Sequence, residues 1–145
     1  MLALNAHAKV NLTLEVLGRR EDGYHDIATI LQTIDLSDTL TFEPANVITL
    51  ECNEPELQST VNLALRAAHL LGESTGCDKG ALISLQKEIP AAAGLGGGSS
   101  DAAATLMGLN ELWSLGLSVA ELTPIATELG SDVAFFLHGG TAMGL

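Results

Sequence analysis

The chain has 145 residues, of which 47% are hydrophobic, and its formal net charge at pH 7 is −12. The hydrophobic fraction and a mean hydropathy of +0.32 exclude a disordered chain and are sufficient for one compact domain with a core. The strong acidic balance argues against nucleic-acid binding, which requires a basic face. The six basic residues are Lys9, Arg19, Arg20, Arg66, Lys79 and Lys87.

The N-terminus, the apolar runs and the cysteines indicate a cytoplasmic protein. The first nine residues have no basic start and continue into a strand pattern, unlike a signal peptide. No run of about eighteen apolar residues is free of charge, so no membrane span is predicted. Cys52 and Cys77 lie 25 positions apart without metal-ligand spacing. We therefore interpret them as reduced thiols.

The first half of the chain has strand patterns. Residues 9–17 alternate, with Val10 and the even positions apolar and Lys9 and Asn11 together on the other face. Taken alone, Lys9 is most simply a solvent-facing strand lysine. Asp22-Gly23 predicts a hairpin turn. Further strands are predicted over residues 26–35, 39–42 and 47–52.

The second half mixes helices with strands. A helical stripe over residues 60–71 ends at Gly72, and a strand follows over 81–86. A long helix beginning at Asp101 carries Trp113 toward the core. Ser118 and Glu121 form a capping box for a helix reaching Gly130. Pro124 lies in the interior of this predicted helix, where we expect a kink or a restart with Thr123 as cap.

A glycine-rich stretch connects the strand over 81–86 to the long helix. Glycines allow close approach of backbone N–H groups to a ligand, and a helix start carries partial positive charge, so this stretch predicts a phosphate site. A simple glycine linker is the alternative. A Walker loop is excluded because no lysine follows Gly98, and a Rossmann fingerprint because Ser99 replaces its third glycine. The stretch is Pro90, Ala91, Ala92, Ala93, Gly94, Leu95, Gly96, Gly97, Gly98, Ser99, Ser100 and Asp101, the last three being good N-cap residues.

Asp132 follows Gly130 and Ser131 at a predicted turn beside an apolar cluster, Val133 to Leu137. A turn-capping aspartate and a functional carboxylate are both compatible with this pattern. A further strand begins near His138. No internal repeat is present, so the chain is predicted to form one domain of mixed strands and helices.

Four stretches together resemble the 4-diphosphocytidyl-2-C-methyl-D-erythritol kinases of the galactokinase, homoserine kinase, mevalonate kinase and phosphomevalonate kinase (GHMP) superfamily. They are residues 8–12, 18–25, 89–103 and 130–136. The glycine stretch alone indicates only the superfamily, whereas the Asp-Gly-Tyr-His turn after two arginines is far more specific. The resemblance departs from the family pattern at His7, Pro124 and Ala134.

The resemblance implies an α+β fold, the two-layer N-terminal domain of GHMP kinases over residues 1–145, with a mixed sheet packed on helices. Family members are about twice as long, so we expect an N-terminal fragment that lacks the C-terminal domain. An uncovered apolar face of such a fragment would favour self-association.

The resemblance also implies the reaction and its residues. ATP, with Mg²⁺ bridging its phosphates near Ser100 or Asp101, would phosphorylate the 2-hydroxyl of 4-diphosphocytidyl-2-C-methyl-D-erythritol. Asp132 would accept or orient the hydroxyl proton, and Lys9 would stabilise the aspartate and the transferred phosphoryl group. The stretch from Pro90 to Ser100 would hold the phosphates. The remaining assignments are Asn62 and Lys87 near the adenine, Asn11 beside the transferred group, and Tyr24 and His25 at the cytosine.

Two alternatives stay open. Another GHMP kinase, such as a mevalonate or homoserine kinase, would share the glycine stretch, although Tyr24 and His25 argue against it. A non-enzymatic nucleotide-binding module is the second alternative for a chain of half the family length.

Overall fold

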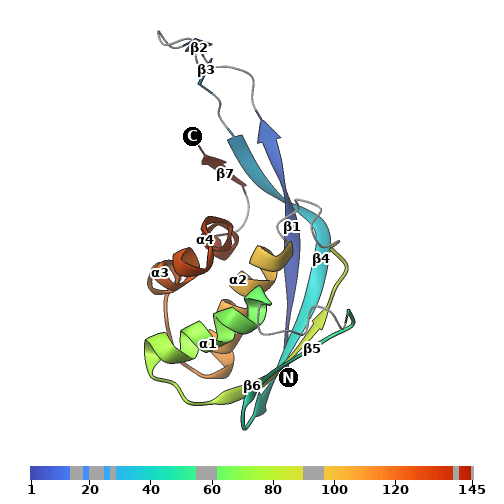
Figure 1. The fold of residues 1–145 in the computed structure, drawn as a ribbon, viewed down its shortest axis with the longest axis vertical. Helices are drawn as coiled ribbons and strands as arrows, with labels where there is room; N and C mark the ends of the chain where they lie inside the picture. Colours follow the sequence, from blue (N-terminus) through green and yellow to red (C-terminus); the bar gives the residue numbers. More distant parts are fainter. Residues whose placement is uncertain are drawn as a thin grey trace.

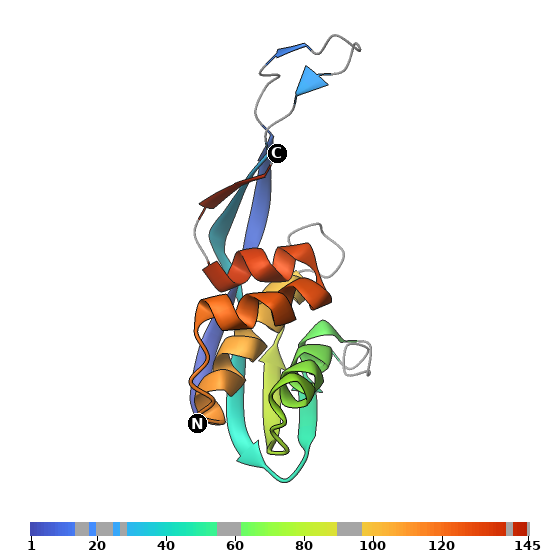
Figure 2. The ribbon, with the colours of Figure 1, turned by 90° about the vertical axis from the view of Figure 1, so that its left-hand side faces the viewer.

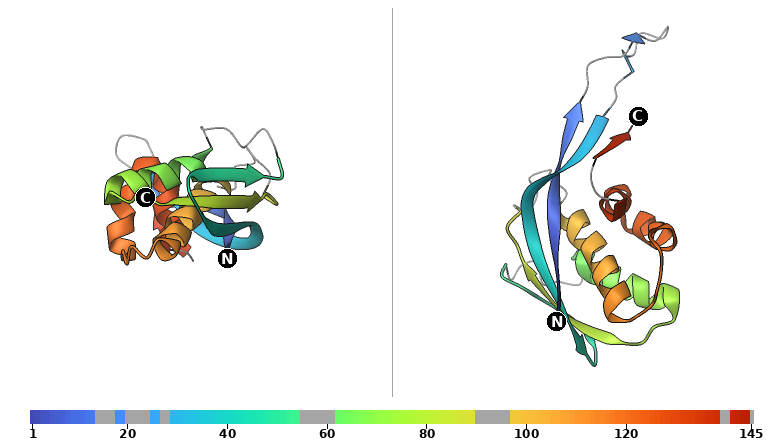
Figure 3. Two further views of the ribbon diagram at one scale, coloured as in Figure 1. Left: turned by 90° about the horizontal axis from the view of Figure 1, so that it is seen from below. Right: turned by 180° about the vertical axis from the view of Figure 1, so that it is seen from behind.

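The computed structural model describes residues 1–13, 18–19, 25–26, 29–54, 62–89, 97–138 and 141–144, with side chains for all of these except 10–13, 18–19, 25–26, 29–35 and 141–144. The main sheet forms one layer and the helices α1 to α4 cover one of its faces (Figures 1 and 2). The view from below separates the two layers most clearly (Figure 3). The predicted two-layer α+β architecture is therefore confirmed.

The elements follow in the order β1 (Leu2–Thr13), β2 (Gly18–Arg19), β3 (His25–Asp26), β4 (Thr29–Ala45), β5 (Ile48–Cys52), α1 (Leu63–Thr75), β6 (Gly80–Gln86), α2 (Gly97–Leu112), α3 (Val119–Leu129), α4 (Ser131–His138) and β7 (Thr141–Gly144). The sheet order is β1-β4-β6-β5, with β7 also paired to β4. Among the described strands of this sheet, β5 and β6 run parallel and the other pairs are antiparallel. Strands β2 and β3 form a separate antiparallel pair, consistent with the predicted hairpin.

Strand β4 runs without interruption over 17 residues, so the prediction of two strands over 26–35 and 39–42 is wrong. Along one edge it pairs with β1 from Thr29 to Phe42. Along the other edge, β6 pairs with its second half and β7 with residues Thr29–Gln32. Pairing with β1 at Ser37 and Asp38 carries the strand across polar residues that a sequence pattern assigns to a turn.

Strand β1 is irregular between His7 and Lys9, which face Ser37 and Thr33 of β4. One residue of β1, Ala8, therefore spans the same interval as three residues of β4. Ala8 and Lys9 are both buried, at 0% and 5% exposure, although neighbours on a regular strand face opposite sides. The irregularity turns Lys9 toward the helices, as bulges beside functional sites often do. Lys9 is thus not the solvent-facing strand residue that simple alternation predicts.

Helix α2 lies at the centre of the core and packs on β1, β4 and α1. Gly108 permits this packing, because a Cβ there would lie 2.4 Å from the Phe42 ring. Trp113, predicted as a core residue, is 3% exposed, and its Nε1 donates a hydrogen bond to the Gly80 carbonyl at 3.0 Å. Among the described residues, no helix is long and apolar enough to cross a membrane.

The helix ends differ in part from the predicted ones. Helix α1 continues through buried Gly72 to Thr75, and Gly76, with φ of 69°, forms its left-handed C-cap. The capping box of α3 is present as predicted. Helix α3 is also continuous through Pro124, so the expected restart at Thr123 is wrong. The Thr123 hydroxyl instead donates to the Val119 carbonyl.

Candidate active site

Helix α2 begins at Gly97, four residues before the predicted start at Asp101. Ser99, Ser100 and Asp101 thus lie inside the first turns, and their prediction as N-cap residues is wrong. Gly97 lets the helix start approach the preceding segment, since its Cβ would lie 3.2 Å from the Lys87 Nζ. At Gly98 a Cβ would meet no described residue within 4 Å.

The N-terminal end of α2 can bind an anion. The first N–H groups of a helix have no intrahelical acceptor and carry partial positive charge. Among the described residues, none lies within 4 Å of a Cβ placed at Gly98, which leaves room for a phosphate to approach them. Residues Pro90 to Gly96, which complete the predicted loop, lie outside the described residues. The part of the site that the structure describes is the helix start with Gly97, Gly98, Ser99 and Ser100.

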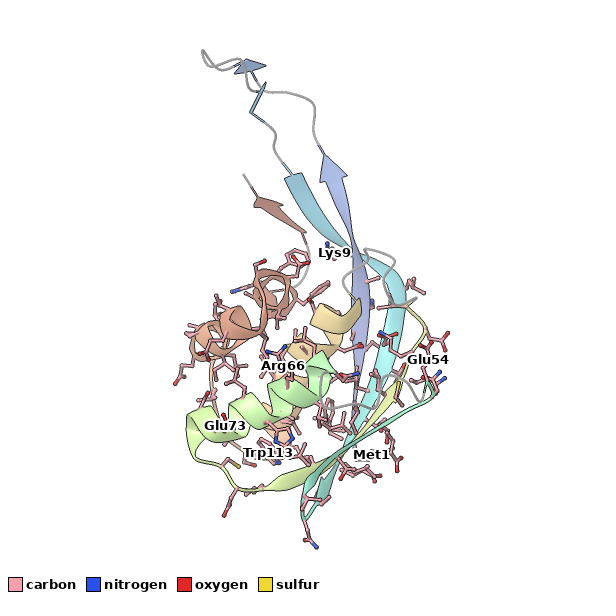
Figure 4. All side chains as sticks on the ribbon, in the orientation of Figure 1. Met1, Lys9, Glu54, Arg66, Glu73 and Trp113 are labelled. Atoms are coloured by element: carbon pink, nitrogen blue, oxygen red, sulfur yellow. The ribbon has the colours of Figure 1, made fainter. Side chains whose placement is uncertain are left out.

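Lys9 of β1 and Asp132 of α4 form an ion pair, with 3.6 Å between the lysine Nζ and the aspartate Oδ2. Figure 4 shows Lys9 on β1 near the N-terminal end of α2. The two side chains differ in access: that of Lys9 is 7% exposed and that of Asp132 is 42% exposed. The proximity expected from the sequence is therefore present, with a buried cation behind an accessible carboxylate.

A buried ion cluster of Asp38, Lys87 and Asp101 lies beside the start of α2. The Lys87 Nζ donates to the Asp38 Oδ2 at 2.7 Å and to the Asp101 Oδ2 at 3.0 Å. All three side chains are at most 4% exposed. The Asp38 Oδ1 also accepts hydrogen bonds from the N–H groups of Glu88 and Ile89, at 2.7 and 2.8 Å.

The two carboxyl groups of the cluster differ in their protonation. Burial raises the pKa of Asp101 to about 8, helped by a hydrogen bond to Asp38 and opposed by Lys87. Burial also acts to raise the pKa of Asp38, but hydrogen bonds from Asp101, Ile89, Lys87 and Glu88 outweigh it and hold that pKa below its usual value. The buried Oδ1 of Asp101 accepts no hydrogen bond from the described residues, which also disfavours a charge there. Near pH 7 the cluster holds one ammonium, one carboxylate and one carboxylic acid.

The other predicted site residues are described in different detail. Asn62 is the N-cap of α1, where its Oδ1 accepts from the Ala64 N–H at 2.8 Å. Asn11 lies in β1 opposite Leu31, and His25 in β3 opposite Arg19, both described by their backbone alone. Tyr24 lies outside the described residues. The roles proposed for these residues stay predictions.

Sequence reasoning missed Asp38, although a signal was available. Asp38 shares its strand parity with the buried Leu40 and Phe42, so it places a carboxylate in a row of core positions. Lys87 likewise continues the buried row of Ile83 and Leu85 beyond the end of β6. A charge in a core row is costly unless an opposite charge meets it, so two such rows in one sheet indicate an ion pair.

Comparison with known proteins identifies relatives along the whole chain. The family model described as the GHMP kinases N terminal domain matches residues 62–140. A protein of Symbiobacterium thermophilum named 4-diphosphocytidyl-2-C-methyl-D-erythritol kinase is 56% identical over 138 residues, which are 94% of this chain and 49% of that protein. A Bacillus cereus protein of the same name is 50% identical over 145 residues, 98% of this chain and 50% of that protein.

Solved structures share the fold. A crystal structure of 4-(cytidine 5'-diphospho)-2C-methyl-D-erythritol kinase has a TM-score of 0.79 and 44% identity, and the match covers 99% of this chain and 51% of that one. The mevalonate kinase of Methanococcus jannaschii has a TM-score of 0.76 at 18% identity, covering 99% and 53% of the two chains, which shows the fold alone. The chain spans about half the length of the curated relatives it matches. Since the family model covers more than half of its residues, the chain belongs to the GHMP kinases, with the match to their N-terminal domain over residues 62–140.

Proposed function

We propose that this chain is the N-terminal half of a 4-diphosphocytidyl-2-C-methyl-D-erythritol kinase, an enzyme of the non-mevalonate route to isoprenoids. The complete kinase would transfer the γ-phosphate of ATP to the 2-hydroxyl of 4-diphosphocytidyl-2-C-methyl-D-erythritol. The observation that carries the proposal is the Lys9–Asp132 ion pair near the N-terminal end of α2. The relatives of that name support the choice of substrate.

Asp132 orients the acceptor hydroxyl and takes its proton. Its side chain is 42% exposed, so a substrate hydroxyl can reach it. The buried Lys9 ammonium lies beside this carboxylate and offsets charge on the transferring phosphoryl group. Phosphoryl transfer requires little of the protein beyond positioning and charge stabilisation, and this pair supplies a part of both.

The first turn of α2 and the residues before it bind the ATP phosphates. The helix start at Gly97, with no described residue within 4 Å of a Cβ at Gly98, supports this assignment. Mg²⁺ bridging the phosphates would neutralise part of their charge; the described residues contain no cluster of three His, Cys, Asp or Glu side chains able to hold a metal ion by themselves. A site of this kind usually holds Mg²⁺ through one or two protein ligands and the phosphates. Asn62 and Lys87 mark the adenine side.

Tyr24 and His25 select the cytosine, and Asn11 lies beside the transferred group. The cytosol is the proposed location, consistent with Cys52 and Cys77 being thiols that do not form a disulfide with each other. The alternative of a different GHMP kinase rests on the shared fold with mevalonate kinase. A substrate panel tests the proposal: the complete kinase is given ATP with the cytidine substrate, mevalonate or homoserine, and ADP release is measured. Turnover with the cytidine substrate alone is expected, and turnover with either of the others instead would overturn the assignment.

A further inference from the structure

We propose that the buried ion cluster of Asp38, Lys87 and Asp101 is a positioning device for the phosphate site: it ties the segment before residues 90–96 and the helix after them to strand β4. In this arrangement the Lys87 ammonium acts inward and does not bind a phosphate. The inference rests on the proposed nucleotide binding at the start of α2, and it adds a role that this function does not assign.

Asp38 anchors the segment before residues 90–96. Its two carboxylate oxygens receive three hydrogen bonds from consecutive residues, one from the Lys87 ammonium and two from the backbone N–H groups of Glu88 and Ile89. Strand β6 ends at Gln86, so no strand partner is available to these N–H groups in the sheet. Asp38 thus replaces the strand pairing at the point where the chain leaves the sheet.

Lys87 has its polar atoms engaged within the protein. Its backbone N–H donates to the Asn53 Oδ1 at 2.7 Å, and its carbonyl accepts from the Asn53 Nδ2 at 3.3 Å. Its ammonium contacts the carboxyl groups of Asp38 and Asp101, and the Lys87 side chain is 4% exposed. Few cations are present in this chain, and this one is committed to neutralising buried acid.

Asp101 connects the cluster to the helix after residues 90–96. Its carboxyl group lies 3.0 Å from the Lys87 Nζ, and Gly97 brings the helix start within contact of Lys87 and Ile89. The two ends of the phosphate-binding stretch therefore meet over one buried carboxylate of β4. Displacing either end moves the N–H groups that face the phosphates, and small misplacements of such groups are costly in binding and catalysis.

The chemistry of the cluster predicts unequal effects of two similar substitutions. In Asp38→Asn, an amide N–H would face either the ammonium or the two backbone N–H donors, which leaves donors buried without acceptors. In Asp101→Asn, the amide replaces a carboxylic acid that already carries a proton near pH 7. An amide can accept from Lys87 and donate to Asp38 as this acid does, so Asp101→Asn should be tolerated.

The first experiment measures amide hydrogen exchange in the chain without ligand, for Glu88, Ile89 and the first two turns of α2. Asp38→Asn and Lys87→Met are expected to raise exchange there by about tenfold or more, the size expected for a buried unpaired group. Asp101→Asn and the matched acid-to-amide control Glu88→Gln, an exposed neighbour, should stay within about threefold. If Asp38→Asn does not fold, the double variant Asp38→Asn/Lys87→Met replaces it, because it leaves no unpaired ammonium.

The second experiment measures the KM for ATP and the kcat of each variant. In the complete kinase, Asp38→Asn and Lys87→Met should raise the KM for ATP about tenfold or more while kcat changes much less. Asp101→Asn should raise this KM less than either of them, and the control Glu88→Gln should leave it near normal. If Lys87 bound a phosphate directly, Lys87→Met alone would weaken ATP binding, and amide exchange at Glu88 and Ile89 would stay unchanged. That result, or equal exchange in Asp38→Asn and Glu88→Gln, would overturn the inference. If the wild-type protein binds no ATP, the proposed function fails, and the exchange experiment still decides the role of the cluster.

Discussion

At the scale of single residues, Lys9 and Asp132 have complementary environments. The Lys9 side chain is buried and the Asp132 side chain is accessible. A substrate could therefore reach Asp132, while solvent counter-ions have little access to Lys9. A surface ion pair would be worth little, and it would have no reason to be built on a strand irregularity. The irregularity between His7 and Lys9 is consistent with the catalytic role proposed for Lys9, since bulges are common beside active sites.

Substituting either partner of this pair should remove most of the activity. In the complete kinase, Asp132→Asn or Lys9→Ala is expected to lower kcat by about a hundredfold or more, the scale of a positioned acid–base or charge-stabilising group. Steady-state kinetics at saturating ATP and cytidine substrate measure this. Glu128→Gln, an acid-to-amide change at an exposed position of α3, serves as control. Near-normal turnover in Asp132→Asn would refute the role of that residue.

A separate prediction concerns His25. In the complete kinase, His25→Ala should raise the KM for the cytidine substrate much more than the KM for ATP. Hydrogen-bonding groups discriminate strongly between ligands, because their loss leaves the partner unpaired. Initial rates with each substrate varied in turn give both constants. An equal rise of the two would contradict a role of His25 in cytosine recognition.

Several site residues could be predicted from the sequence, and others required the fold. The motif resemblance predicted the proximity of Lys9 and Asp132, but simple alternation placed Lys9 on the solvent side, since a two-residue offset in the partner strand leaves no mark in the sequence of β1. The partners of Lys87 were not predicted, because Asp38 is 49 residues away and their meeting depends on the order of β4 and β6.

At the scale of elements, α2 combines a core face with the helix start at which we propose phosphate binding, and one glycine lies in each of these two parts. Gly108→Ala should destabilise the protein by about 1–3 kcal/mol, because the new Cβ would lie 2.4 Å from the Phe42 ring. Gly98→Ala should leave stability unchanged or raise it by up to about 1 kcal/mol, since the site is helical and open. Thermal unfolding of both variants tests the contrast.

The same pair distinguishes packing from binding. The Cβ of Gly98→Ala occupies the space through which a phosphate would approach the helix N–H groups, so this variant should bind ATP more weakly despite its intact fold. Calorimetric titration with Mg-ATP measures the affinity. Unchanged affinity in Gly98→Ala would argue against phosphate binding at the start of α2.

The ion cluster joins three elements and should impose a pH dependence on stability. The raised pKa of Asp101, about 8, lets the folded state keep this proton up to about pH 8, whereas the unfolded state releases it near the ordinary pKa of 3.8. The free energy of unfolding should therefore fall as pH rises between these values, by up to about 1.4 kcal/mol per pH unit. The lowered pKa of Asp38 acts below that window, and the raised pKa values of Lys87 and Cys52 act above it.

Denaturant unfolding at several pH values between 4 and 8 measures this slope. Asp101→Asn should flatten it, because an amide does not titrate, and Glu88→Gln should leave it in place. A slope that persists unchanged in Asp101→Asn would show that Asp101 is ionised in the folded protein near pH 7.

Strand and helix positions were predicted better than their ends. The periodic segments of β5, β6 and α3 were located by their apolar patterns, whereas α2 begins four residues early because the glycines and serines adopt the helix that Lys87 and Ile89 support by contact. Gly72 was mistaken for a helix end, because a buried glycine inside a helix and a C-cap glycine look alike in sequence. The early start of α2 depends on contacts with Lys87 and Ile89, which lie outside the sequence pattern of the helix itself.

At the scale of the whole molecule, the described surface gives little support to the expected uncovered apolar face. The large hydrophobic residues exposed among the described ones are Met1, Leu36, Val47 and Val119. They come from the N-terminus, β4, the turn before β5 and the start of α3, and isolated exposed residues of this kind are ordinary. Self-association of the chain stays a prediction, to be checked by its light-scattering mass.

The chain by itself should fold, bind ATP weakly and fail to turn over. Its sheet and four helices enclose a continuous core from Ala6 to Leu137, which supports independent folding. The start of α2, the ion cluster and the Lys9–Asp132 pair all belong to this half, so part of the affinity for ATP should be retained. Turnover requires donor and acceptor to be held in line in a site shielded from water, and the matched relatives are about twice as long as this chain. A coupled assay of ADP release tests this: a substrate-dependent rate typical of kinases, about 1–100 s⁻¹, would show that these 145 residues suffice for catalysis.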